Sequence, residues 1–191
     1  MAEGKTMALV MCSTRTPRLN PFIAAYVLDQ LAPLLAGTAV AAIDTIDLAD
    51  QQLPFYDEPV LPACLPGADP TPHALRPRAH APLYNWSVPA VLKNALDFLF
   101  HEWKGKPAGI VSYGFRRGDT EGDMAAAHLQ DVLTGLRMRP APTAPGLITT
   151  AIMIAACTES GRVSEYDRTR WRDAGVEDQL KAMARELLQG L

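Results

Sequence analysis

The chain has 191 residues, of which 48% are hydrophobic and 20% are charged, and its formal net charge is −3. This composition is typical of one globular domain and excludes disordered and fibrous classes. The small negative charge also argues against a nucleic acid or an anionic membrane as a partner held by bulk charge.

Cysteines and histidines give no sign of a metal centre. Cys12, Cys64 and Cys157 lie far apart and are odd in number, and the four histidines show no ligand spacing. Unpaired, scattered cysteines fit a reducing compartment. No apolar stretch resembles a signal peptide or is long enough to span a bilayer, so we expect a soluble cytoplasmic protein.

The first part of the chain predicts a strand, a helix and a second strand. Residues 7–12 form a short apolar run, typical of a strand buried on both faces of a parallel sheet. After a polar loop, Asn20 is placed to cap a helix over residues 21–35, where apolar side chains recur at helical spacing. Residues 39–48 favour a second strand, and the βαβ arrangement predicts an α/β fold.

The polar loop between the first strand and the first helix has the chemistry of an anion site. Its hydroxyl and guanidinium groups come from Ser13, Thr14, Thr16, Arg15 and Arg18. Free N–H groups at the start of the helix would add further donors. The loop matches neither a Walker motif nor a Gly-x-Gly-x-x-Gly turn. An ordinary capped loop with solvated arginines is the alternative, and these residues alone leave both interpretations open.

The segment over residues 49–83 is irregular by composition. It holds eight of the chain's 16 prolines. Because proline cannot donate to a strand ladder, we expect no central strand to run through this segment.

Residues 84–86, with the sequence Tyr-Asn-Trp, end a loop that turns into a helix. Ser87 is placed to cap this helix, and apolar side chains recur at helical spacing over residues 88–99. A loop of this kind at the head of a helix suits a flat ring with polar edges. The alternative is a surface loop with one buried tryptophan.

Strands and helices continue to alternate to the end of the chain. We therefore expect one domain over residues 1–191. The remaining predicted elements are a strand over 108–113, a glycine-spaced loop over 114–122, a helix over 124–136, a strand over 146–157, a polar loop over 158–172 and a terminal helix over 180–191.

Three motifs give the chain a resemblance to a known family. The first is Cys-Ser-Thr-Arg at residues 12–15, directly after the first predicted strand. The second runs over residues 82–97, where the Tyr-Asn loop enters a Ser-x-Pro-x-x-Leu-Lys-Asn-Ala-x-Asp helix, and it is the most specific. The third is Ser-Tyr-Gly at residues 112–114. In this order and spacing, they make the chain resemble the NADPH-dependent FMN reductases, which include quinone, azo-dye and chromate reductases.

The resemblance implies a flavodoxin-like fold, which is a doubly wound parallel sheet of strand order 2-1-3-4-5 flanked by helices. It also implies FMN and NADPH or NADH as cofactors. The implied cofactor-binding residues are Ser13, Arg15, Arg18 and Asn20 for the FMN phosphate, Tyr84, Asn85 and Trp86 for the isoalloxazine ring, and Ser112, Tyr113 and Gly114 for its pyrimidine side.

The activity implied by the resemblance is hydride transfer from NAD(P)H to FMN, followed by electron transfer to a quinone-like or other small acceptor. The cofactor carries this chemistry, so we expect no dedicated catalytic acid or base. The family also implies a homodimer or homotetramer, packed through apolar helix faces such as Leu92, Leu96 and Phe100. The alternative function is a non-catalytic descendant that serves as a binding or oligomeric scaffold.

One segment departs from the family pattern. Residues 72–81 stand where the family has a helix and an apolar third strand, and they look too short and too rich in proline to form both. We therefore expect the third strand to be missing or distorted, which would leave the Tyr-Asn loop without its anchor. In addition, Cys12 replaces a loop glycine and Leu83 replaces the usual glutamate.

Overall fold

The computed structural model describes residues 5–57, 61–64, 79–82, 87–115 and 121–191. Its strands are β1 (Lys5–Met11), β2 (Val40–Asp47), β3 (Ala79–Pro82), β4 (Pro107–Ala108), β5 (Val111–Phe115), β6 (Arg139–Pro140) and β7 (Gly146–Thr149). Its α-helices are α1 (Asn20–Leu35), α2 (Leu48–Gln51), α3 (Ala90–Asp97), α4 (Glu121–Gly135), α5 (Met153–Ser160), α6 (Glu165–Asp173) and α7 (Val176–Gln189), and a short 3-10 helix spans Pro62–Cys64.

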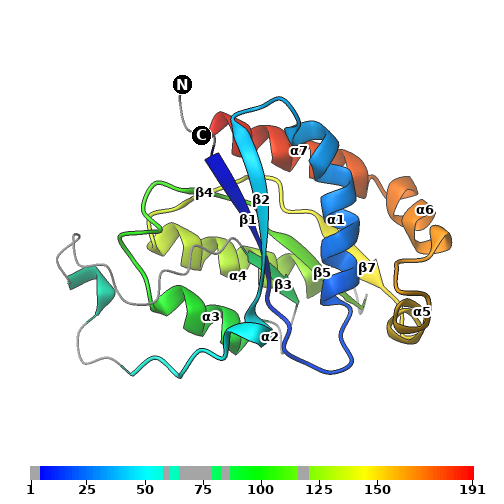
Figure 1. The fold of residues 1–191 in the computed structure, drawn as a ribbon, viewed down its shortest axis with the longest axis horizontal. Coiled ribbons are helices and arrows are strands. Elements are labelled where there is room, and N and C mark those ends of the chain that lie inside the picture. The colour runs from blue at the N-terminus through cyan, green and yellow to red at the C-terminus, as the bar shows by residue number, and fades with distance from the viewer. Residues whose placement is uncertain (1–4, 58–60, 65–78, 83–86, 116–120) are drawn as a thin grey trace.

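A parallel five-stranded sheet of order β2-β1-β3-β5-β7 forms the centre of the fold. Counted along the chain, this is the predicted order 2-1-3-4-5. Helices α1 and α7 lie together on one face, whereas α3 and α4 cover the other (Figure 1). A small parallel sheet of β4 and β6 lies beside the main sheet. The described helices include none that is long and apolar enough to cross a membrane.

The third strand of the main sheet is present, which corrects the expectation that it is missing. The strand β3 pairs with β1 through Ala79 and His80, and with β5 from His80 to Pro82. It is short, and its proline stands at its last residue, where a missing N–H interrupts the ladder least. The prediction of no central strand in the proline-rich segment is therefore wrong at this point, because residues 79–81 carry no proline.

Between α2 and the 3-10 helix, the proline-rich segment has an irregular part, as expected. Residues 52–57 have no regular structure, and they are fastened to α3 by Asn94. Its Oδ1 accepts from the Tyr56 N–H at 2.8 Å, and its Nδ2 donates to the Pro54 carbonyl at 2.8 Å. The rings of Tyr56 and Phe98 meet edge to face, with their centroids 5.2 Å apart. This segment therefore covers part of the helix layer although it lacks backbone ladders.

The region over residues 146–172 differs from the prediction. The strand β7 stops at Thr149, and the rest of the apolar run forms α5. The expected polar loop contains α6, whose first turn is capped by Ser164: its Oγ accepts from the Asp167 N–H at 3.1 Å. The Ser-x-x-Asp pattern at 164–167 is a known sign of a helix start, and it would have predicted α6.

Two predicted helix caps are also wrong. Helix α1 has no side-chain cap, and the Asn20 side chain instead bonds to the loop before it. Helix α3 begins after Pro89 and also lacks a side-chain cap. The Ser87 hydroxyl bonds to His128 Nδ1 on α4 at 2.8 Å. In both cases a tertiary partner replaces the expected local bond.

Two apolar clusters, one on each face of the sheet, form the core. The first joins α1, α6 and α7 to the sheet, and the second joins α3 and α4 to it. Leu92 and Leu96 are fully buried in the second cluster. They therefore offer no surface to another copy of the chain, which corrects that part of the predicted oligomer contact.

Candidate functional site

The candidate site lies at the edge of the sheet where β1, β3 and β5 end. Met11, the last residue of β1, pairs with His80, and Pro82 at the end of β3 pairs with Tyr113 of β5. Since the strands are parallel, the loops that follow them start at the same edge. The structure thus brings the loop over residues 12–19 and residues 112–114 to one edge of the sheet (Figure 1).

The loop after β1 is held from inside by Asn20. The Ser13 N–H donates to Asn20 Oδ1 at 3.0 Å, and both residues are buried. By contrast, Thr14, Arg15 and Thr16 are exposed. The loop therefore presents two hydroxyls and a guanidinium outward while its base is fixed to the first turn of α1. This is the donor chemistry that a phosphate group requires.

Arg18 points toward the neighbouring strand. Its Nη1 donates to the Ser13 carbonyl at 2.6 Å and to Asp47 Oδ1 at 2.7 Å, and its Nη2 donates to Asp47 Oδ2 at 2.6 Å. The two side chains are 21% and 11% exposed, so this two-bond ion pair is largely shielded from water. The sequence analysis missed Asp47, although a carboxylate at the end of the strand adjacent to an arginine-containing loop was a usable signal.

The same contact shifts both pKa values. The hydrogen bond to Asp47 raises the pKa of Arg18 more than burial lowers it. Burial raises the pKa of Asp47, but the hydrogen bonds from Arg18 and from the Ala49 N–H, which is 3.0 Å from Oδ1, together lower it below the usual range. Both groups are thus charged at neutral pH.

Residues 112–114 belong to β5, on the other side of β3 from β1. Ser112 and Tyr113 are buried, and Gly114 is half-buried. The Ser112 N–H donates to the Pro145 carbonyl at 2.9 Å, which ties the strand to the turn before β7. The predicted ring-binding residues Tyr84, Asn85 and Trp86 lie outside the described residues.

Two buried polar atoms of this edge lack a hydrogen-bond partner among the described residues. They are Asn20 Nδ2 in the first turn of α1 and Ser112 Oγ in β5. Buried polar groups are nearly always satisfied, so unpaired ones need an explanation. Together with the exposed hydroxyls and guanidinium of the loop, they fit a site that receives a polar, phosphorylated molecule. Within the described residues, no group of three or more acidic, histidine or cysteine side chains is arranged to hold a metal ion.

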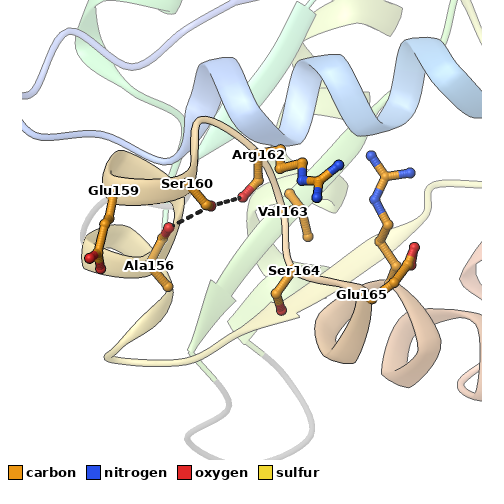
Figure 2. A pocket seen from close by; sticks show the side chains of 8 residues that line it. Ala156, Glu159, Ser160, Arg162, Val163, Ser164 and Glu165 are labelled. Carbon is orange, nitrogen blue, oxygen red and sulfur yellow. Dashed lines mark hydrogen bonds between the residues drawn. The ribbon is translucent and has the colours of Figure 1, made fainter.

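A separate pocket of about 520 Å³ lies in the hairpin between α5 and α6 (Figure 2). Its wall includes Glu159 and Glu165 as well as Arg162 and Arg168, so its formal charges cancel. The Ser160 hydroxyl is engaged by the carbonyls of its own hairpin, as the dashed lines in Figure 2 show. None of the predicted site residues lines this pocket.

Comparison with known proteins gives a consistent result. Residues 6–151 match the model of a family described as NADPH-dependent FMN reductase. The chain is 32% identical over 199 residues to the NAD(P)H-dependent FMN reductase ntnL of Nectria sp, a match that covers 96% of each chain. It is also 36% identical over 150 residues to the NAD(P)H-dependent FMN reductase LOT6 of Saccharomyces cerevisiae, covering 69% of this chain and 75% of the relative.

Solved structures share the fold at lower sequence identity. FerB from Paracoccus denitrificans, a flavoenzyme NAD(P)H:(acceptor) oxidoreductase, superposes with a TM-score of 0.59 at 21% identity, and the match covers 95% of this chain and 98% of FerB. An oxidoreductase from Corynebacterium diphtheriae gives a TM-score of 0.63 at 16% identity, covering 99% of this chain and 97% of the other.

Proposed function

The chain belongs to the NADPH-dependent FMN reductase family, and from this premise we propose where it binds FMN and what accepts its electrons. It is an NAD(P)H-dependent oxidoreductase, with FMN and NADPH or NADH as its cofactors. The scaffold alternative is not favoured, because the curated relatives are named as reductases over most of the chain.

We place the FMN phosphate on the loop after β1. The observation that supports this placement is the position of β3 between β1 and β5, which brings residues 12–19 and residues 112–114 to one edge of the sheet. The phosphate would lie against the exposed hydroxyl and guanidinium groups of Thr14, Arg15 and Thr16.

Buried residues of the site support the loop and the ring side of the cofactor. Ser13 and Asn20 fix the base of the loop through the bond between the Ser13 N–H and Asn20 Oδ1. Ser112, Tyr113 and Gly114 would bound the pyrimidine side, where Ser112 Oγ has a free hydrogen-bonding capacity among the described residues. We keep Tyr84, Asn85 and Trp86, which follow the end of β3 after one residue in the sequence, as proposed contacts of the ring.

The chemistry that FMN supplies when bound is acceptance of a hydride from NAD(P)H and release of the electrons to an acceptor. The chain's own contribution is to bind and orient. The loop after β1 holds the phosphate end, and backbone groups at the ends of β3 and β5 orient the ring. No side chain is required to transfer a proton in this proposal.

We propose a small, flat, quinone-like molecule as the acceptor, as the family resemblance implies. Steady-state NADPH oxidation should be faster with a soluble quinone than with oxygen alone. Equal rates with and without the quinone would contradict the acceptor proposal and leave the FMN site untouched.

The phosphate placement is tested with Arg15→Ala. We expect FMN binding, measured by quenching of flavin fluorescence, to weaken roughly tenfold, since one charge-assisted contact contributes about 1.5 kcal/mol. Arg139→Ala is the matched control, because Arg139 is also exposed and bonds to the Gly105 and Gly190 carbonyls away from the site. Unchanged FMN affinity in Arg15→Ala would contradict the placement.

A homodimer or homotetramer remains part of the proposal. Large exposed apolar side chains, among them Phe55 at 83% and Ile152 at 75% exposure, are available for such contacts. Light scattering on the purified protein measures the mass directly, and a monomer at micromolar concentration would contradict this point.

A further inference from the structure

We infer that Asp47 is a positioning residue for the FMN phosphate: it holds Arg18, and through Arg18 it fixes the shape of the loop that follows β1. This inference rests on the proposed function, because it concerns the same site. It gives Arg18 a role different from direct phosphate binding, and it adds a residue from β2 that the family motifs in the sequence did not indicate.

The peptide groups on both sides of Ser13 are tied. Its N–H donates to Asn20 Oδ1 at 3.0 Å, and its carbonyl accepts from Arg18 Nη1 at 2.6 Å. The first bond joins the loop to helix α1, and the second joins it to a guanidinium. Ser13, at the start of the loop, is therefore fixed by two side chains from its far end, Arg18 and Asn20.

Arg18 is itself fixed by Asp47. Both carboxylate oxygens accept from the guanidinium, at 2.7 and 2.6 Å, which is the fork geometry that orients an arginine most strictly. Asp47 is the last residue of β2 and its Oδ1 also accepts from the Ala49 N–H at the start of α2. The carboxylate is thus anchored to the sheet and to a helix start, so it is a rigid support for the arginine.

The charge balance also favours a positioning role. Asp47 neutralises Arg18, and both side chains are mostly buried. Three of the five N–H donors of the Arg18 guanidinium are taken by the Ser13 carbonyl and the Asp47 carboxylate, so these partners hold the side chain against the sheet. FMN binds more tightly if the loop already has its binding conformation, because no conformational entropy is then lost by ordering the loop on binding.

The two roles of Arg18 predict opposite effects of one substitution. If Arg18 contacted the phosphate directly, Asp47→Asn would remove a competing anion, and FMN would bind equally well or more tightly. If Asp47 positions the loop, the same substitution weakens FMN binding. Riboflavin lacks the phosphate, so if Asp47 positions the loop, Asp47→Asn should leave the dissociation constant of riboflavin almost unchanged.

The experiment measures dissociation constants of FMN and riboflavin for the wild type, Asp47→Asn and Arg18→Lys by fluorescence quenching. We expect FMN binding to weaken roughly tenfold in both variants and riboflavin binding to change by less than about twofold. The phosphorus NMR signal of bound FMN should also move in Asp47→Asn. Asp29→Asn is the matched control. Asp29 lies on α1, outside the proposed site, and its Oδ2 forms an ion pair with Arg168 Nη2 at 2.9 Å.

Circular dichroism and a cooperative melt establish that each variant is folded. Should Asp47→Asn not fold, Asp47→Glu decides: glutamate keeps the competing negative charge but is one methylene longer, so it weakens FMN binding only if Asp47 fixes the position of Arg18 and the loop. FMN binding as tight as wild type, or an equal loss for riboflavin, would overturn the inference while the proposed function stands. A wild-type protein that bound neither flavin would overturn the proposed function itself.

Discussion

At the scale of single residues, the ion pair between Arg18 and Asp47 has a consequence for stability. The pKa of Asp47 is lowered in the folded chain: burial alone raises it, but the hydrogen bonds from Arg18 and the Ala49 N–H lower it more. A carboxyl group of this kind stabilises the fold above the pKa of an unfolded aspartate, about 4, and this contribution is lost as the pH falls through the folded pKa.

Asp47→Asn should therefore lower the free energy of unfolding at neutral pH by roughly 1–3 kcal/mol. The difference in free energy of unfolding between the variant and the wild type should shrink as the pH falls below about 4. The wild-type carboxyl group then becomes protonated and loses the charge that the variant lacks. Urea unfolding at several pH values measures this. A difference that stayed constant down to about pH 2 would show that the charge of Asp47 is not the cause.

Tyr26 is the opposite case to Asp47, because burial raises its pKa and no hydrogen bond from the described part of the chain lowers it. Burial, followed by the charge of Glu177, raises the pKa of Tyr26 to about 12. Its hydroxyl has no hydrogen-bond partner among the described residues, and the centroid of its ring lies 4.9 Å from the ring centroid of Trp171. A phenol with a raised pKa stabilises the fold below the unfolded pKa of about 10, and this stability is lost as the pH rises toward 12.

Tyr26→Phe should leave the free energy of unfolding at neutral pH within about 1 kcal/mol of the wild type, because the substitution removes an unpaired hydroxyl and keeps the ring. It should also reduce the loss of stability above about pH 10. Tyr166→Phe is the control, since Tyr166 is 75% exposed. A loss of several kcal/mol in Tyr26→Phe at neutral pH would mean that the hydroxyl has a partner.

At the scale of elements, close packing between the sheet and α7 depends on a glycine. A Cβ at Gly109, just before β5, would lie 2.9 Å from Met183 Sδ and 3.1 Å from Leu187 Cδ1, both on α7. Gly109→Ala should destabilise the fold by about 1–2 kcal/mol, because the helix side chains have to move. Gly135→Ala, where nothing lies within 4 Å, should be neutral or stabilising by about 0.5 kcal/mol. Thermal melts compare the two, and equal effects would contradict this packing.

Local sequence patterns predicted the elements that have an apolar run or apolar side chains at helical spacing. The strands β1 and β2 and the helices α1, α4 and α7 agree with the predicted ranges to within a few residues, apart from the start of α7. The failures have physical causes. The apolar run after β7 could not be divided into strand and helix by hydropathy alone. The cap residues of α1 and α3 found tertiary partners, which no local pattern contains.

At the scale of the whole molecule, the βαβ pattern predicted the α/β fold and the family resemblance implied the strand order, whereas neither predicted a regular β3. A strand of four residues that includes a proline has almost no local signal, and its place is set by pairing with β1 and β5. The loop over residues 12–19 and residues 112–114 start from one edge of the sheet, while Tyr84, Asn85 and Trp86 lie outside the described residues, so the binding role of these residues stays a prediction. The sequence did not predict that Arg18 turns toward Asp47, because that contact joins residues 29 positions apart and requires β1 and β2 to be placed side by side first.

The most direct test of the account is to load the purified protein with FMN, remove the free flavin and add NADPH without oxygen. The account predicts that the protein retains FMN, that its visible flavin absorbance is lost on addition of NADPH, and that the absorbance returns when a quinone is added. A protein that retains no FMN, or bound FMN that NADPH does not bleach, would contradict it.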